Sequence, residues 1–325
     1  MRLLKSQQQQ KRRHKIMAAI TAAMVKDLRE QSGAGMMDCK KALAECDGDM
    51  DAAFELLRKN GAAKAEKKAS RIAAEGICKV VVEGNTAVVL EVNSETDFVA
   101  KNEKFQTYVE KVAKQILKSD VNTIDELLTQ PWAEDSSKTV NDVHVEMVAT
   151  IGEKLSLRRF EKVTSDGFVV SYTHGGGRIG VIVDMAGAES DAAKEAATNI
   201  AMQIAALNPK YVSRDEVSAD YIAHEKEILL AQIMNDPKES QKPEKVINGM
   251  IEGRVSKELK EICLLDQVYV KAEDGKQTVA KYLEEVSKAT GSALSIKSFV
   301  RFETGEGLEK KNEDFAAEVA AQMNA

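Results

Sequence analysis

The residues most suggestive of chemistry are a histidine and three glycines at positions 174–177. A His-Gly-Gly-Gly run can supply the backbone amides of an oxyanion hole in esterases. That chemistry also needs a nucleophilic serine in a G-x-S-x-G turn, and no such turn occurs in the sequence. Gly175, Gly177 and Gly180 also fit the spacing G-x-G-x-x-G, but a dinucleotide site requires a helix to follow. A strand-like segment, residues 179–184, follows instead, so we interpret the glycines as a hairpin turn.

Other reactive side chains are scattered without the spacing of a catalytic or metal site. The four histidines and four cysteines lack the short intervals of zinc ligands. No G-x-x-x-x-G-K-[ST] loop is present, which argues against a nucleotide-hydrolysing site of the chain's own. The residues concerned are His14, His144, His174, His224, Cys39, Cys46, Cys78 and Cys263. We therefore expect no catalytic residues, no metal and no cofactor, and we predict that the protein is not an enzyme.

Length and charge favour a folded protein that interacts directly with neither a membrane nor a nucleic acid. The chain has 325 residues, of which 43% are hydrophobic and 30% are charged, and its formal net charge is -6. This acidic balance is unlike the basic surface of nucleic-acid-binding proteins. No apolar run approaches the roughly 20 residues of a membrane span. We predict a cytoplasmic protein, with the basic, glutamine-rich residues 1–16 as a disordered extension.

The segment from Met17 to about Arg71 has the pattern of three short helices. Thr21 and Asp49 are placed to cap two of them, and Gly33 and Gly61 to end two of them. The third helix is expected to run from residue 51 to residue 60. The Ala- and Lys-rich stretch 62–74 is expected to be a linker or an exposed helix.

Two later regions share the order of a β-hairpin followed by a helix. Strand-like segments 77–82 and 86–92 flank the turn signal Gly84-Asn85 and precede a helix from 96 to about 117. Segments 168–172 and 179–184 precede a helix from about 192 to 207. Two amphipathic stretches follow within 215–263 and predict an antiparallel helical hairpin inserted into the second region. Whether this hairpin also joins two copies in a homodimer is left open. A strand at 296–302 and a helix at 314–323 complete a fold of the α+β class.

One junction between strand and helix, Glu91–Lys101 with the sequence EVNSETDFVAK, is unusual. Thr96 or Ser94 can cap the helix, and Asp97 lies in its positively polarised first turn. Phe98 precedes Phe105 by seven residues and can lie on the buried face of the same helix. It can equally project from the surface as the apolar anchor of an interface. Periodicity does not choose between the two.

This junction closely resembles the central signature of the elongation factor Ts family. A second signature of that family is similar to LREQSGAGMMDCKKAL, which starts at Leu28. Further similar stretches are IGEKLSLRR from Ile151, YTHGGGRIGV from Tyr172, RFETGEG from Arg301 and DFAAEVAAQ from Asp314. The resemblance covers essentially the whole chain after Met17, in order.

The resemblance implies a guanine nucleotide exchange factor that binds the GTPase elongation factor Tu and promotes release of its GDP. Thr96, Asp97, Phe98 and Val99 would enter the GTPase near its magnesium site, with Phe98 as an apolar wedge. Further partner contacts implied by matching positions are Lys26, Arg29, Met36, Met37, Lys40, Ile151, Gly152 and His174. The two methionines can also be core residues, and the cations can be an ordinary solvated surface.

The resemblance also implies how the chain is divided. The expected parts are an N-terminal module at 17–71 resembling a ubiquitin-associated (UBA) domain, two core halves at 72–160 and 161–305, and a C-terminal module at 306–325. The helical hairpin at about 215–263 is inserted into the second half. The alternative function is a helical adaptor that binds a ribosomal or ubiquitin-like partner. An adaptor would not need residues 96–99, so these residues distinguish the two hypotheses.

Overall fold

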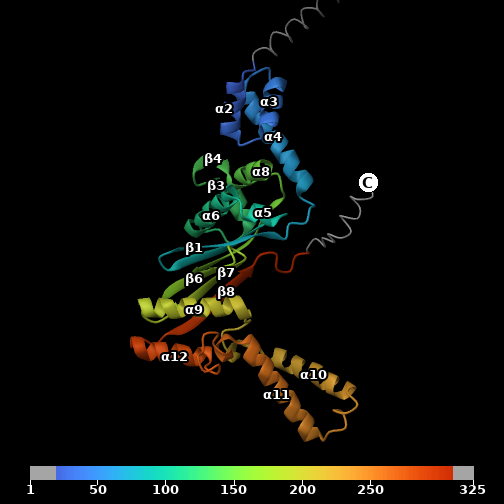
Figure 1. Ribbon diagram of the computed structural model, residues 1–325, viewed down its shortest axis with the longest axis vertical. Helices are drawn as coiled ribbons and strands as arrows, with labels where there is room; N and C mark the ends of the chain where they lie inside the picture. The colour runs from blue at the N-terminus through green and yellow to red at the C-terminus, as the bar shows by residue number, and fades with distance from the viewer. Residues whose placement is uncertain (1–19, 310–325) are drawn as a thin grey trace, which may run out of the picture.

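The computed structural model describes residues 20–309, which form an elongated molecule (Figure 1). A helical module lies at one end, two β-sheets flanked by helices form the middle, and a helical hairpin projects at the other end. The extension predicted at 1–16 and the helix predicted at 314–323 lie outside the described residues. Within the described part the chain is an α+β protein, as the sequence predicted.

The N-terminal module consists of α2 (Ala22–Ser32), α3 (Met36–Glu45) and α4 (Met50–Lys68). Both predicted caps are confirmed, since Thr21 accepts a hydrogen bond from the Met24 amide and Asp49 accepts one from the Ala52 amide. The predicted end of the third helix at Gly61 is wrong. The Ala- and Lys-rich sequence that follows favours helix strongly enough to carry α4 past the glycine.

The first core half is an antiparallel sheet covered on one face by helices. Its strand order is β1 (Glu75–Glu83), β2 (Thr86–Ser94) and β5 (Leu155–Thr164). The covering elements are α5 (Asp97–Ala100), α6 (Glu103–Lys118), α7 (Ile124–Thr129), β3 (Pro131–Trp132), β4 (Asp135–Thr139) and α8 (Val140–Ile151). Phe105 and Leu127 are fully buried in the core that these elements share with the sheet.

The second core half repeats this arrangement. Its strand order is β6 (Phe168–His174), β7 (Ile179–Ala186) and β8 (Ser295–Glu303), and its covering helices are α9 (Asp191–Leu207) and α12 (Val279–Thr290). In each half the middle strand pairs with its hairpin partner and with a strand that returns after a helix. The predicted pair of hairpin-plus-helix halves is therefore confirmed.

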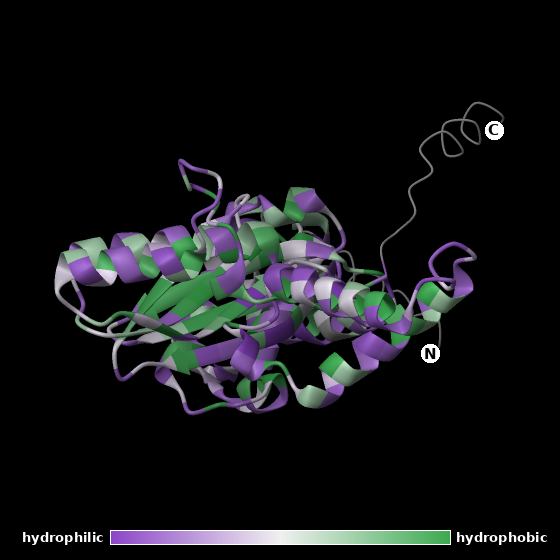
Figure 2. Cartoon of the chain, turned by 90° about the horizontal axis from the view of Figure 1, so that it is seen from below, coloured by the Kyte–Doolittle hydropathy of each residue, from purple (hydrophilic) through white to green (hydrophobic). Residues whose placement is uncertain are grey.

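The two sheets pack face to face, so that the core runs from helices through two sheets to helices (Figure 1). Cys78, Val89 and Ile182 are among the side chains buried between them. A Cβ atom at Gly180 would lie 3.0 Å from a methyl group of Val80 and 3.1 Å from one of Val89. Gly180 therefore permits the close approach of the sheets, whose strands form a predominantly hydrophobic centre in Figure 2.

A buried carboxylate joins the two halves. Glu91 on β2 is fully buried, and its oxygens lie 2.8 Å from Arg158 and 2.6 Å from Arg159 of β5. Glu91 also accepts a hydrogen bond of 2.8 Å from the amide of Gly305, which follows β8. Because a buried charge is costly unless it is paired, these three partners must stay together around Glu91.

The predicted hairpin is also confirmed, and it consists of α10 (Ala219–Asn235) and α11 (Glu244–Ile262). Its helices enclose a small core that includes Ile233, Ile251 and Val255. A hydrogen bond of 2.6 Å joins the Tyr221 hydroxyl on α10 to Glu258 on α11. The hairpin projects away from the sheets at the end opposite the N-terminal module (Figure 1).

Candidate functional site

The segment that carries Phe98 is a short helix of its own. The sequence predicted one helix from Thr96 to about Leu117, and this is wrong because α5 ends at Ala100 and α6 begins at Glu103. The side chain of Asn102 accepts hydrogen bonds from the amides of Lys104 and Phe105 and so starts a new helix. The break removes Phe98 from the buried face of α6.

Phe98 projects from the surface while its neighbours are buried. Its side chain is 80% exposed, whereas Val99 is 8% exposed and Phe105 is fully buried. The interpretation of Phe98 as a core residue is therefore wrong. Val99 anchors the short helix in the first core, and an exposed aromatic ring on an anchored turn is available to a partner at little cost in conformational entropy.

A carboxylate from a distant part of the chain holds this turn in place. Glu153 accepts hydrogen bonds from the amides of Glu95 and Thr96, at 3.1 and 3.0 Å, and from the Thr96 hydroxyl at 2.7 Å. The expected capping bond of Thr96 is thus absent, because its hydroxyl is used by Glu153. Ser94 does not cap the helix either, and its hydroxyl donates to the Thr96 carbonyl at 3.0 Å.

Glu95 also fixes this turn, and Glu95 and Glu153 together are called the clamp below. It accepts a hydrogen bond of 2.6 Å from the amide of Lys154 and lies 3.1 Å from Arg71. Sequence reasoning named neither Glu95 nor Glu153 as a functional residue. The available signal was their place inside the two family-like stretches EVNSETDFVAK and IGEKLSLRR.

Asp97 brings an exposed negative charge next to Phe98. Its carboxylate lies 2.6 Å from the ammonium group of Lys101, one turn further along the chain. The hydrogen bond from Lys101 and its positive charge lower the pKa of Asp97. Asp97 is therefore ionised at neutral pH, beside an apolar ring.

The structure brings the Asp97 turn next to the glycine-rich turn after β6. Asp97 and Lys101 line a pocket of about 310 Å³ together with Gly175, Gly176 and Arg178. Glycines 175, 176 and 177 all have positive φ angles, of 58°, 66° and 103°, which confirms the predicted hairpin turn. His174 is exposed at the start of this turn, and its Nδ1 atom lies 2.9 Å from the Tyr172 hydroxyl.

Two other predicted contact residues lie beside the clamp. Ile151 is the last residue of α8 and packs partly buried against the first core. Gly152 ends α8 in the left-handed conformation, with φ 85°, and its amide donates to the carbonyl of Val148. Gly152 therefore turns the chain so that Glu153, the next residue, reaches Thr96.

The remaining predicted residues lie on the N-terminal module. Met36 is 55% exposed and Met37 is 73% exposed at the start of α3, so the interpretation of these methionines as core residues is wrong. Lys26 and Arg29 on α2 and Lys40 on α3 are exposed as well. The module thus presents an apolar pair and three cations to solvent.

Comparison with known proteins identifies the family. A family profile described as Elongation factor TS matches residues 95–306. The protein named Elongation factor Ts from Clostridium novyi is 51% identical over 309 residues, which cover 94% of this chain and 99% of that protein. The chain belongs to the elongation factor Ts family.

Other members of the family give the same result over almost their entire length. Elongation factor Ts from Clostridioides difficile is 50% identical over 94% of this chain and 100% of its own length. The protein of the same name from Halothermothrix orenii is 48% identical over 92% of this chain and 97% of its own length. The chain is thus a translation elongation factor of protein biosynthesis.

Within residues 20–309, no group of three or more His, Cys, Asp or Glu side chains is arranged to hold a metal ion. None of the helices there is both long and apolar enough to cross a membrane.

Proposed function

We propose that this elongation factor Ts is a guanine nucleotide exchange factor for elongation factor Tu and acts in the cytoplasm. The observation that carries the proposal is Phe98, an exposed aromatic ring on a turn fixed by Glu153 and by the burial of Val99. A single exposed apolar side chain is common on protein surfaces, but an aromatic ring on a turn that the core anchors has the form of an interface anchor. Thr96 and Val99 hold the turn, while Asp97 and Phe98 contact the partner.

The proposed mechanism requires no covalent chemistry from this chain. In a GTPase, GDP is held by the amides of the phosphate-binding loop and by Mg²⁺, which neutralises phosphate charge. Phe98 inserts as an apolar wedge near the magnesium site, and the charge of Asp97 disturbs the environment of the metal. Weakening either support lowers the barrier to GDP release.

The other exposed residues extend this contact. Met36 and Met37, with Lys26, Arg29 and Lys40, face the nucleotide-binding domain of the GTPase. Ile151 and Gly152 add contacts beside the clamp, and His174 meets another domain of the partner. We propose the division at 17–71, 72–160, 161–305 and 306–325 as the corresponding functional units.

The direct test is release of fluorescent GDP from elongation factor Tu with and without the full chain. Exchange requires that the chain bind the nucleotide-free GTPase best, so the chain weakens the binding of GDP to the GTPase. GDP must then weaken the binding of the chain to the GTPase by the same factor. Strong acceleration together with this reciprocal weakening supports the proposal. Binding that leaves GDP release unchanged contradicts it and favours the helical adaptor.

A further inference from the structure

The N-terminal module is attached to the core along a single helix. Helix α4 lies beside α8, and at Gly61 a Cβ atom would lie 3.5 Å from the Cβ of Ala149. A second close approach joins Gly33, in the turn after α2, to Thr150 near the end of α8. A Cβ at Gly33 would lie 3.1 Å from the Thr150 hydroxyl oxygen.

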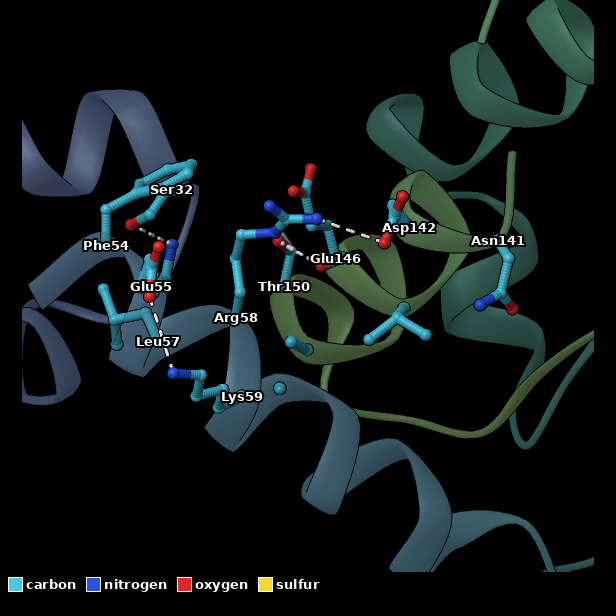
Figure 3. Close-up of a pocket in the computed structure, with 14 residues that line it drawn as sticks. Ser32, Phe54, Glu55, Leu57, Arg58, Lys59, Asn141, Asp142, Glu146 and Thr150 are labelled. Atoms are coloured by element: carbon cyan, nitrogen blue, oxygen red, sulfur yellow. Dashed lines mark hydrogen bonds and ion pairs between the residues drawn. The ribbon is translucent and has the colours of Figure 1, made fainter. Parts of the chain in front are cut away.

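Near these contacts the N-terminal module and the first core half leave a pocket between them. A pocket of about 440 Å³ lies between α4 and α8, lined by Phe54 and Leu57 of α4 and by Glu146 and Thr150 of α8 (Figure 3). Arg58 extends across it, and its guanidinium lies 3.1 Å from the carboxylate of Asp142. The Arg58–Asp142 ion pair therefore bridges this pocket and ties the two helices together.

Asp142 is a rigid anchor for Arg58. Thr139 and Asp142 form a reciprocal capping box at the start of α8, in which each side chain binds the other's backbone amide. The hydrogen bond from the Thr139 amide is the main cause that lowers the pKa of Asp142, and the charge of Arg58 adds to it. The carboxylate is therefore ionised and fixed in place before Arg58 meets it.

Helix α8 is also the element that supports Phe98. It begins beside Asp142, where Arg58 is held, and it ends at Gly152, directly before Glu153. The N-terminal module, which contacts α8 from Asp142 to Thr150, and the Phe98 turn, which Glu153 holds directly after α8, are thus both mounted on one helix.

We propose that the contact between α4 and α8, with Arg58 as its positioning residue, holds the N-terminal module so that Met36–Met37 and Phe98 meet one partner together. This inference rests on the proposed exchange function. Two binding surfaces on a rigid frame act at a high effective concentration toward each other, and a loosened frame loses that advantage. Arg58 itself need not touch the partner.

The first test separates this role from simple charge effects. Arg58→Ala and Lys59→Ala remove the same charge from adjacent residues of α4, but among the described residues Lys59 pairs with Glu55 of its own helix and with nothing on α8. We expect Arg58→Ala to raise the half-saturating concentration in GDP release by roughly twofold to fivefold, as the loss of one ion pair implies. The maximal rate should stay unchanged, Lys59→Ala should match the wild type, and Arg58→Lys should recover part of the loss.

The second test fixes the contact covalently. The distance of 3.5 Å between Cβ positions at Gly61 and Ala149 suits a disulfide, so Gly61→Cys with Ala149→Cys should form one on oxidation. Cys46, the partly exposed natural cysteine in the described part, is replaced by serine. The oxidised form should keep full exchange activity and should abolish the effect of Arg58→Ala.

The outcomes separate the role of the α4–α8 contact from the exchange function. An oxidised form that is folded but slower than its own reduced form overturns the inference, because the module must then leave α8 to engage the partner. Equal activity of Arg58→Ala and the wild type at every concentration overturns it as well. If the wild-type chain itself leaves GDP release unaccelerated, the exchange function fails, and this inference with it.

Discussion

Replacing Glu153 with alanine disturbs the support of Phe98 without altering Phe98 itself. The change removes three hydrogen bonds, two from the amides of Glu95 and Thr96 and one from the Thr96 hydroxyl. At about 1 kcal/mol of net stabilisation for each bond, the ordered turn loses about 3 kcal/mol. Since about 1.4 kcal/mol corresponds to a tenfold change, the half-saturating concentration in GDP release should rise by up to about a hundredfold.

Two measurements check this prediction together. Release of fluorescent GDP is followed as a function of chain concentration, and amide hydrogen exchange is followed in residues 94–101. Glu153→Gln keeps one carbonyl oxygen to accept the backbone bonds but loses its charge. Charge-assisted bonds are about twice as strong as neutral ones, so we expect a loss of about tenfold for this variant. Glu161→Ala removes the same charge from an exposed site on β5 and should behave as the wild type.

Two outcomes would contradict the role of Glu153 in ordering Phe98. If Glu153→Ala exchanged GDP like the wild type at every concentration, with no faster amide exchange in residues 94–101, the clamp would not be what orders Phe98. Faster amide exchange with unchanged GDP release would show that order in this turn is unnecessary for function.

Three further predictions concern stability, measured by urea unfolding. Phe98→Ala should change the free energy of unfolding by less than about 0.5 kcal/mol because the ring is exposed, while Phe105→Ala should cost about 3–5 kcal/mol. Burial lowers the pKa of His144 from 6.5 to about 4. Between these pH values the unfolded chain is protonated at this histidine and the folded chain is not, so the free energy of unfolding falls as pH drops from about 6.5 to 4. The loss between pH 7 and pH 5 should be about 2 kcal/mol, and His144→Gln should lack it. Glu91→Gln should destabilise the chain by about 3 kcal/mol because it leaves Arg158 and Arg159 without their buried partner.

Local signals in the sequence were sufficient for much of the fold. The turn at Gly84, the caps at Thr21 and Asp49 and the helical hairpin depend on residues close together in the chain, and all are confirmed. Elements between residues 119 and 164, including α7, α8 and β5, were not predicted. Their short apolar segments are defined by packing on the first sheet more than by a period of their own.

The candidate site shows the same division between local and distant causes. Asn102 is a strong helix-capping residue, and reading it as a cap would have placed the break between α5 and α6. The contact of Glu153 with Thr96 joins residues 57 positions apart, and no local pattern predicts it. The prediction that Gly61 ends a helix was wrong because this glycine serves a tertiary contact. It lets α4 approach Ala149 of α8.

The most direct test of the central claim is the rate of GDP dissociation from elongation factor Tu with wild-type chain and with Phe98→Ala. We predict strong acceleration by the wild type and a large loss of it in the variant, with both proteins equally stable. Burial of an exposed phenylalanine at an interface contributes about 2–4 kcal/mol, so the loss should be at least about thirtyfold. Equal acceleration by the two proteins would contradict the role of Phe98, and no acceleration by either would contradict the exchange function.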